Sequence, residues 1–341
     1  MLSTLKKYLY NNVYINILQS SNNINVYVEE ISYNGSSENF EKNFKSSERS
    51  AMLEFVVANM KRSPINYVSI LDPSLTQGAA PACTPKEIEK YCDLEEYEYV
   101  CVDDSWSYYT SKFDLLELKG RYNRTGLDFV FSPFYMLENF YKDKVKGEIS
   151  LFILVNEDYM SLSIFEKSNL KYASLLDLQQ ESESDDELIM DEDDEEELIL
   201  DEIQSNSVDL EGIDVDDDIE GLDDFDDLDD LDGFDDLDDF EDSEDLDETY
   251  EDNDKPVEDI IEGDTFGDDY HRFALIQSAV NNFYKDPKFD SEFIQHAYIA
   301  DGISLSPEFK RFLEEEMFLN VVIRKIDIEQ ELCDLAKVEK K

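Results

Sequence analysis

The stretch that decides the fold is residues 13–28, VYINILQSSNNINVYV, in which two alternating runs flank a group of turn-forming residues. In the runs 13–18 and 24–28 apolar side chains recur at every second position, as in a half-buried strand, and residues 19–23 favour a turn. This pattern predicts an antiparallel β-hairpin. The same strand and turn pattern returns later in the chain, where it predicts strands at 149–155, 159–165 and 170–176.

Elsewhere the apolar spacing changes to three and four residues, which is typical of helices that pack on a core. Helices are predicted at 47–62, from Thr84 onward, at 132–142, at 273–283, at 307–317 and at 327–337, and further strands at 67–71, 97–102, 293–300 and 319–323. Both halves of the chain therefore begin with antiparallel strands and continue with alternating helices and strands. The sequence predicts an α/β fold in which a β-β-β-α-β-α unit occurs twice.

Acidic residues are concentrated in one segment of the chain. The 341 residues carry a formal net charge of -56, and 47 of the 85 acidic residues lie from Glu181 to Asp269, beside one basic residue, Lys255. Low hydrophobicity combined with such a net charge is typical of disorder, so we expect a disordered acidic insertion at 180–267. An acidic chain is also a poor direct partner for nucleic acid or for an anionic membrane surface.

Within this insertion, Leu or Phe occurs at every third residue from Leu222 to Phe240, with Asp at nearly all positions between them. A period of three does not keep an apolar stripe on one face of an α-helix. Two interpretations stay open: a solvating spacer, or an acidic and hydrophobic ligand that docks on a basic partner. The near match to a calcium-binding loop that begins at Asp216 is weak, because no amphipathic helix flanks it.

The four cysteines predict a reducing compartment. Cys83, Cys92, Cys101 and Cys333 form no CxxC pair, and two histidines are too few to complete a zinc site with them. We interpret them as reduced thiols in structural positions of a cytosolic protein. We expect no signal peptide, because residues 1–8 have neither an apolar signal core nor a cleavage site, and no apolar run approaches the ~20 residues that span a bilayer.

Catalytic motifs are sparse in this sequence. Neither a GxxxxGK[ST] loop nor a GxGxxG loop occurs. The two histidines, His271 at the start of a predicted helix and His296 within a predicted strand, are expected to be structural, and no metal site is predicted. Among so many acidic residues, no pair of carboxylates can be singled out for acid–base catalysis.

A duplicated unit with an insertion in its second half resembles the actin-like (ribonuclease H-like) ATPase fold. More narrowly, it is similar to PilM and to the cytoplasmic part of GspL, proteins of type IV pilus, type II secretion and competence machines. The resemblance covers about residues 8–176 and 268–338. It rests on the order of the elements, on the strand end 298–305 (YIADGISL), where that fold has its adenosine-binding turn, and on the closing helix with residues 335–339.

The resemblance implies a division of the chain and a set of site residues. The division is a first lobe at 1–147, a second lobe at 148–179 plus 268–341, and the insertion at 180–267. The site residues carried over by position in the fold form a degenerate adenosine turn: Ala300, Asp301, Gly302 and Ser304.

The two predicted hairpins lack the residues with which active members of the fold hold ATP. Those members carry Asp and Gly in each hairpin turn, so that backbone amides approach the phosphates and Asp holds the metal. Here neither hairpin contains glycine, and Asn16 and Asn156 stand near the positions of the acids. A Cβ crowds such a turn, and asparagine lacks the metal-binding charge. We therefore expect no catalysis and no cofactor, with residual ATP binding left open.

The resemblance finally implies a function and its partners. It implies a non-catalytic scaffold in the bacterial cytoplasm, peripheral to the inner membrane through its partners. The scaffold would bind the cytoplasmic tail of an inner-membrane assembly protein in a cleft between the two halves, with a motor ATPase as a further partner. Two alternatives are an ATP-binding actin-like switch or ATPase, and a protein whose acidic tract binds partners or cations.

Overall fold

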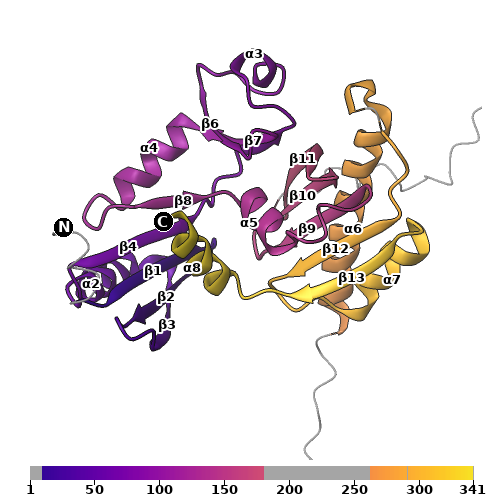
Figure 1. Ribbon diagram of the computed structural model, residues 1–341. Coiled ribbons are helices and arrows are strands. Elements are labelled where there is room, and N and C mark those ends of the chain that lie inside the picture. Colours follow the sequence, from indigo (N-terminus) through magenta and orange to yellow (C-terminus); the bar gives the residue numbers. More distant parts are fainter. Residues whose placement is uncertain (1–9, 180–261, 290, 341) are drawn as a thin grey trace, which may run out of the picture. The chain divides into compact units, whose positions relative to one another are not determined.

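Two five-stranded sheets with the same strand order organise the residues that the computed structural model describes, 10–179, 262–289 and 291–340 (Figure 1). In each sheet three strands form an antiparallel meander, and two later strands extend the sheet beyond the first strand and parallel to it. The first sheet has the order β3 (Ser37–Lys45), β2 (Asn23–Ile31), β1 (Asn12–Gln19), β4 (Ile65–Leu71), β8 (Phe129–Phe131). The second has the order β11 (Asn169–Asp177), β10 (Tyr159–Glu166), β9 (Ser150–Val155), β12 (His296–Asp301), β13 (Asn320–Lys325). This shared order confirms the predicted duplication.

Alternation along β1 decides what each face of the first sheet packs against. Val13, Ile15 and Ile17 are buried in an apolar cluster with α2 (Arg49–Met60). Tyr14 belongs to the cluster on the other face, which includes Leu332 of α8 (Ile328–Glu339). Successive side chains of a strand point to opposite faces of the sheet. Because both faces of this sheet are covered, β1 carries apolar residues at odd-numbered and at even-numbered positions. Each large apolar side chain buried in this way contributes about 1.5 to 3 kcal/mol.

The second sheet is covered on both faces as well. Every residue of β9 is buried. Ile153 belongs to the cluster formed with α6 (Glu262–Lys285) and α7 (Pro307–Glu316). Phe152 belongs to the cluster on the opposite face, which includes residues of α5 (Pro133–Phe140). The strands predicted within residues 149–176 therefore bury side chains on both faces of the sheet, and helices cover each face.

The chain on the two sides of the acidic segment forms one sheet. β12 follows that segment and pairs in parallel with β9, with Ala297 opposite Leu151. This pairing is the one expected if the segment is an insertion. The closing helix α8 then leaves the second sheet and packs on β1, β2 and β4 of the first (Figure 1).

A third, three-stranded sheet lies between β4 and β8 in the sequence, and its existence is a correction to the predicted order of elements. It has the order β5 (Gln77–Ala80), β7 (Trp106–Ser111), β6 (Tyr97–Val102), and it is accompanied by α3 (Pro85–Ile88) and α4 (Lys112–Arg121). The predicted strand at 97–102 exists, but it pairs with β7 and not with β4. The elements β3, β5, β7, β8 and α4 were not predicted.

The prediction of four reduced thiols is wrong for two of the cysteines. Cys83 and Cys101 form a disulfide, with their Cα atoms 5.3 Å apart. Cys101 lies on β6 and Cys83 shortly after β5, and both strands pair with β7, so the sheet brings together residues that are 18 positions apart in the sequence. A search for CxxC pairs does not detect this spacing. Cys92 and Cys333 are free, and Cys333 is buried.

The predicted acidic insertion at 180–267 lies, except for its last residues, outside the described part of the chain, and so does the predicted calcium loop. The last residues, from Glu262, belong to α6, which therefore begins earlier than the predicted helix. Among the described residues, no helix is long and apolar enough to cross a membrane.

Candidate functional site

The predicted adenosine turn follows β12 and is organised by one carboxylate. Asp301 is buried, and its side-chain oxygens accept hydrogen bonds from the backbone N–H groups of residues 303–305 at 2.7 to 3.2 Å. Ser304 has a left-handed φ of 67°, so that the turn wraps around this carboxylate. Ala300, which precedes Asp301, is fully buried in the core. The structure thus brings the predicted residues together in one turn, and Asp301 binds the backbone of that turn.

Gly302 is packed against the beginning of α8. A Cβ atom at this position would lie 2.7 Å from both the Cδ1 of Ile328 and the carbonyl oxygen of Val155, and Gly302 donates its N–H to that same carbonyl at 3.1 Å. Real Cβ contacts are essentially never this short. The space beside Gly302 is therefore already filled by the protein itself.

The two hairpin turns that would hold phosphates in an active member of the fold contact each other. The backbone N–H of Ser21, in the turn between β1 and β2, donates to Oδ2 of Asp158 at 2.7 Å. Asp158 lies in the turn between β9 and β10, and its Oδ1 accepts a hydrogen bond from Gln179. A backbone amide in a turn is a natural donor to an anion. Here that donor is taken by a carboxylate of the same chain.

The two asparagines predicted near the acid positions also make internal contacts. Asn16 is fully buried in the first sheet, where its Oδ1 accepts from Ser69 at 2.5 Å and its Nδ2 donates to the carbonyl of Tyr27. The Oδ1 of Asn156 accepts from the backbone N–H of Glu157 at 2.7 Å. Both amide oxygens are thus used to hold the local backbone or a neighbouring strand.

These turns and α8 enclose a small cavity, which we call the closed cleft. Its volume is about 80 Å³. Ligand pockets for small molecules occupy roughly 300 to 1,000 Å³. Two carboxylates face it, Glu157 and Glu329; burial raises the pKa of Glu329, which also accepts from Asn25 at 2.9 Å. Its lining residues are Leu18, Ser20, Asn23, Asn25, Asn156, Glu157, Gly302, Ile326, Ile328 and Glu329.

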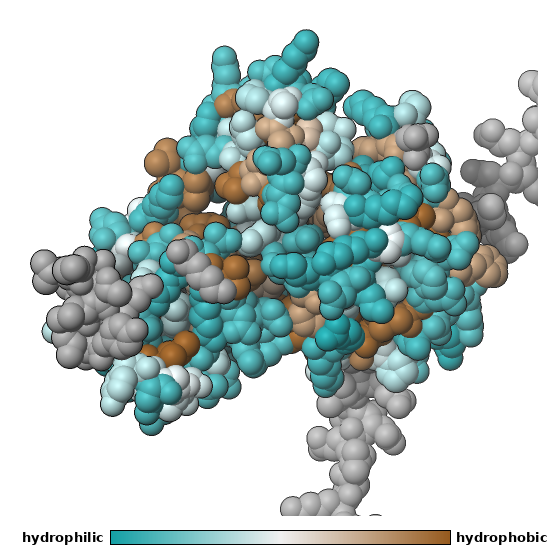
Figure 2. Space-filling model, viewed as in Figure 1, coloured by the Kyte–Doolittle hydropathy of each residue, from teal (hydrophilic) through white to brown (hydrophobic). Residues whose placement is uncertain are grey.

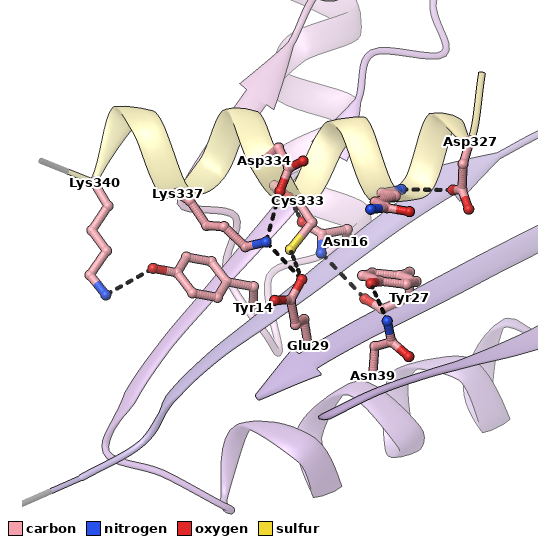
Figure 3. A network of polar contacts seen from close by, with 12 residues as sticks. Tyr14, Asn16, Tyr27, Glu29, Asn39, Asp327, Cys333, Asp334, Lys337 and Lys340 are labelled. Atoms are coloured by element: carbon pink, nitrogen blue, oxygen red, sulfur yellow. Dashed lines mark hydrogen bonds and ion pairs between the residues drawn. The ribbon is translucent and has the colours of Figure 1, made fainter. Parts of the chain in front are cut away.

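A polar network holds α8, which forms one wall of the closed cleft, against the first sheet. Figure 3 shows Lys337 and Cys333 on α8 pointing toward Glu29 of β2, to which Lys337 donates at 2.7 Å and Cys333 at 3.4 Å. Burial disfavours the charged form of Lys337, but its hydrogen bonds to Asp334 and Glu29 outweigh this and place its pKa above the usual range. Near the end of the helix, Lys340 donates to the hydroxyl of Tyr14. The helix is therefore tied to the sheet along its length.

Two larger cavities lie between β6 and β8, lined by residues of the first half of the chain and by Glu339 of α8. Their volumes are about 350 and 420 Å³. They adjoin, because both are lined by Val100 and Tyr108 of the third sheet and by Asp128 and Val130 at β8. Figure 2 shows apolar surface among hydrophilic surface in the region where Figure 1 places β6, α4 and β8. We call these two cavities together the edge-strand groove.

Two edge strands contribute to the walls of the edge-strand groove. β6 is the outer strand of the third sheet and β8 the outer strand of the first, so neither has a further strand partner among the described residues. An edge strand presents backbone N–H and C=O groups that can pair with another extended chain. The groove was not predicted, because the three residues of β8 were not recognised as a strand and the sequence did not indicate that the strand at 97–102 belongs to a separate sheet.

Comparisons with known proteins give a family but no curated relative. The family model described as "Domain of unknown function (DUF8341)" matches residues 151–341, and the one described as "Domain of unknown function (DUF8569)" matches residues 10–138. No curated protein matches the sequence.

Solved structures match this chain at low sequence identity. A Bacteroides thetaiotaomicron protein with actin-like ATPase fold and unknown function is 11% identical, and the match covers 98% of this chain and 99% of that chain with a TM-score of 0.50. A PilM–PilN type IV pilus biogenesis complex matches at 11% identity, 48% and 61% coverage and a TM-score of 0.33. A Ppx/GppA protein of Aquifex aeolicus matches at 9% identity, 49% and 51% coverage and a TM-score of 0.26. The match to the Bacteroides protein, which extends over nearly the whole of both chains, shows that this chain has the actin-like ATPase fold.

Proposed function

We propose that this chain, which belongs to the DUF8341 family of domains of unknown function, acts as a non-catalytic scaffold that binds an extended segment of another protein. One observation carries the proposal: the edge strands of two different sheets, β6 and β8, line the same open groove. Addition of a strand to an exposed sheet edge is a common way to recognise an extended peptide. The binding surface would then be built mainly from the first half of the chain, with Glu339 of α8 at its border, and would not be the cleft between the halves that the sequence led us to expect.

The closed cleft supports the non-catalytic part of the proposal. Its volume of about 80 Å³ is too small for a nucleotide. The carboxylate of Asp158 accepts the hydrogen bond of the Ser21 backbone N–H, and the side chain of Ile328 fills the space beside Gly302. To admit a nucleotide, α8 would have to leave the first sheet, together with its hydrogen bonds to Glu29.

The identity of the machine rests on the resemblance of the sequence to PilM and GspL. On that basis we propose a scaffold of a type IV pilus, type II secretion or competence machine at the bacterial inner membrane. Its partner would be the cytoplasmic tail of an inner-membrane assembly protein, and it would reach the membrane only through such partners. A motor ATPase would be a second partner on the cytoplasmic side.

Photo-crosslinking tests this proposal. The full chain is produced in the cells that naturally contain it, with a photo-reactive amino acid in place of Val100. Val100 is half exposed and lines both cavities of the groove, so a bound segment would lie within reach of it. We expect crosslinks to the cytoplasmic tail of an integral membrane protein, identified by mass spectrometry. The same group at Glu54, which is exposed on α2, is the matched control and should not give this product. Identical products at both positions, or only soluble proteins at position 100, would contradict the proposal.

An ATP-binding switch is the second candidate, and it is favoured by the fold and by the retention of Gly302 in the predicted adenosine turn. The third candidate, in which the acidic tract is the functional part, concerns residues outside the described part of the chain. Excision of residues 181–265 separates it from the scaffold proposal, because a groove built from β6 and β8 should keep its partner without the tract.

A further inference from the structure

The charged side chains of the edge-strand groove are mainly acidic. Four exposed carboxylates line it against one exposed base: Glu98, Asp103, Asp128 and Glu339 against Lys119. A fifth carboxylate, Asp72, is buried and accepts a hydrogen bond from Thr110, so it takes little part in the charge of the surface. Carboxylates gathered in one concave surface favour a cationic ligand and speed its arrival.

Aromatic rings lie beside these carboxylates. Tyr99, Tyr108 and Tyr135 line the groove. The Tyr135 hydroxyl donates to Glu339 at 2.8 Å, and its ring lies 5.9 Å from that of Tyr108. Ring faces next to carboxylates suit Lys and Arg in particular, because the ammonium or guanidinium group is attracted by both. The methylene groups of these side chains can also cover apolar surface such as Val100.

The backbone of β8 gives the orientation of a bound segment. The carbonyl of Phe131 accepts from the N–H of Asp72, so Phe131 directs its backbone groups toward the rest of the first sheet. Backbone direction alternates along a strand, and the N–H and C=O of Val130 therefore point away from β4, toward the groove. An extended chain that pairs with Val130 would direct every second side chain toward the same side of the edge-strand groove.

We infer that the edge-strand groove binds an extended segment that carries Lys or Arg at alternate positions. This inference rests on the proposed function and adds the chemistry of the partner. It agrees with the proposed source, because the cytoplasmic segments next to membrane spans are enriched in Lys and Arg.

The probe is a peptide in which Val alternates with Lys, compared with a peptide in which Gln replaces Lys. Binding to the full chain is measured by fluorescence anisotropy at low and at high salt. We expect the Lys peptide to bind about tenfold more tightly than the Gln peptide at low salt, since each exposed charge pair adds a small amount. The acidic tract also attracts cations, so the comparison that decides is between variants that share the tract.

The groove variant is Glu98→Gln with Asp103→Asn. Asp103 has a φ of 47°, which Asn adopts readily, and Glu98 is exposed, so we expect the variant to fold. It should lose most of the preference for the Lys peptide. The matched control, Glu54→Gln with Glu316→Gln, removes the same charge from exposed positions on α2 and α7 and should keep the preference. If the groove variant and the control keep the same preference, the inference is overturned.

A second variant separates failure of this inference from failure of the proposed function. Val100→Arg places a bulky cation in the groove and should weaken binding of both peptides. If it does so while the groove variant keeps the Lys preference, the groove binds extended segments without regard to charge. If neither variant changes the affinity for either peptide, the groove is not a peptide site and the proposed function falls as well.

The N-terminal segment of this chain is a competing occupant, because it carries Lys6 and Lys7 among apolar residues. The variant Lys6→Glu with Lys7→Glu tests it. If that segment fills the groove, the variant should bind the Lys peptide more tightly than the wild type does, and the inference of a separate partner is overturned. An unchanged affinity supports the partner.

Discussion

Replacement of Ile328 by Ala is expected to lower the free energy of unfolding by about 2 to 5 kcal/mol. Ile328 is 3% exposed, and its Cδ1 fills the space beside Gly302. The substitution removes three carbon atoms from a site where the backbone of Gly302 and the carbonyl of Val155 leave little room for collapse. Urea unfolding of the variant and the wild type measures the difference.

Val322→Ala is the matched control for this experiment. Val322 is 45% exposed on β13, so its truncation should change the stability by no more than about 0.5 kcal/mol. If Ile328→Ala costs as little as the control, the beginning of α8 is loosely packed, and the closed cleft would open at small cost. That result would remove the main support for a non-catalytic protein.

Reduction of the Cys83–Cys101 disulfide is expected to lower the free energy of unfolding by about 3 kcal/mol, because the bond limits the unfolded chain over a separation of 18 residues. Urea unfolding with and without dithiothreitol measures this loss. The double variant Cys83→Ser, Cys101→Ser should have the stability of the reduced protein and should not respond to dithiothreitol. An equal response of the double variant would show that the effect of dithiothreitol does not come from this disulfide, and would contradict the prediction.

The disulfide also bears on the proposed location. Disulfides are rare in the cytosol, where reductants keep thiols reduced. A cytoplasmic scaffold would therefore have to work with Cys83 and Cys101 reduced. Because Cys101 lies on β6 and lines the edge-strand groove, binding of the Lys peptide should be measured on the reduced chain as well.

Much of the fold could be predicted because its main strands carry a strong local pattern. The alternation of residues 13–28 predicted β1 and β2, and Ser132 followed by Pro133 predicted the start of α5, where the Ser132 hydroxyl accepts from the N–H of Phe134. β3 was missed because its sequence, SENFEKNFK, has only Phe40 and Phe44 as apolar residues, and these are four positions apart. α4 was missed because Phe113 and Leu116 face solvent, so its apolar residues do not mark one buried face.

The candidate site depended on contacts that no local pattern reveals. Ser21 and Asp158 are 137 positions apart, and Glu29 and Lys337 are 308 positions apart. The sequence located the turn at 300–304, because element order alone gives the end of β12. It did not reveal that Asp158 and Ile328 close the cleft, since that depends on how the two sheets and α8 meet. The groove between β6 and β8 was hidden for the same reason.

The measurement that tests the central claim most directly is a calorimetric titration of the full chain with Mg-ATP, together with thermal melting at the highest concentration. A chain whose cleft is closed by Asp158 and Ile328 should show no heat beyond dilution and no change in melting temperature. Saturable binding, with the stabilisation of about 2.7 kcal/mol expected at a hundred times the dissociation constant, would contradict the account and favour the nucleotide switch.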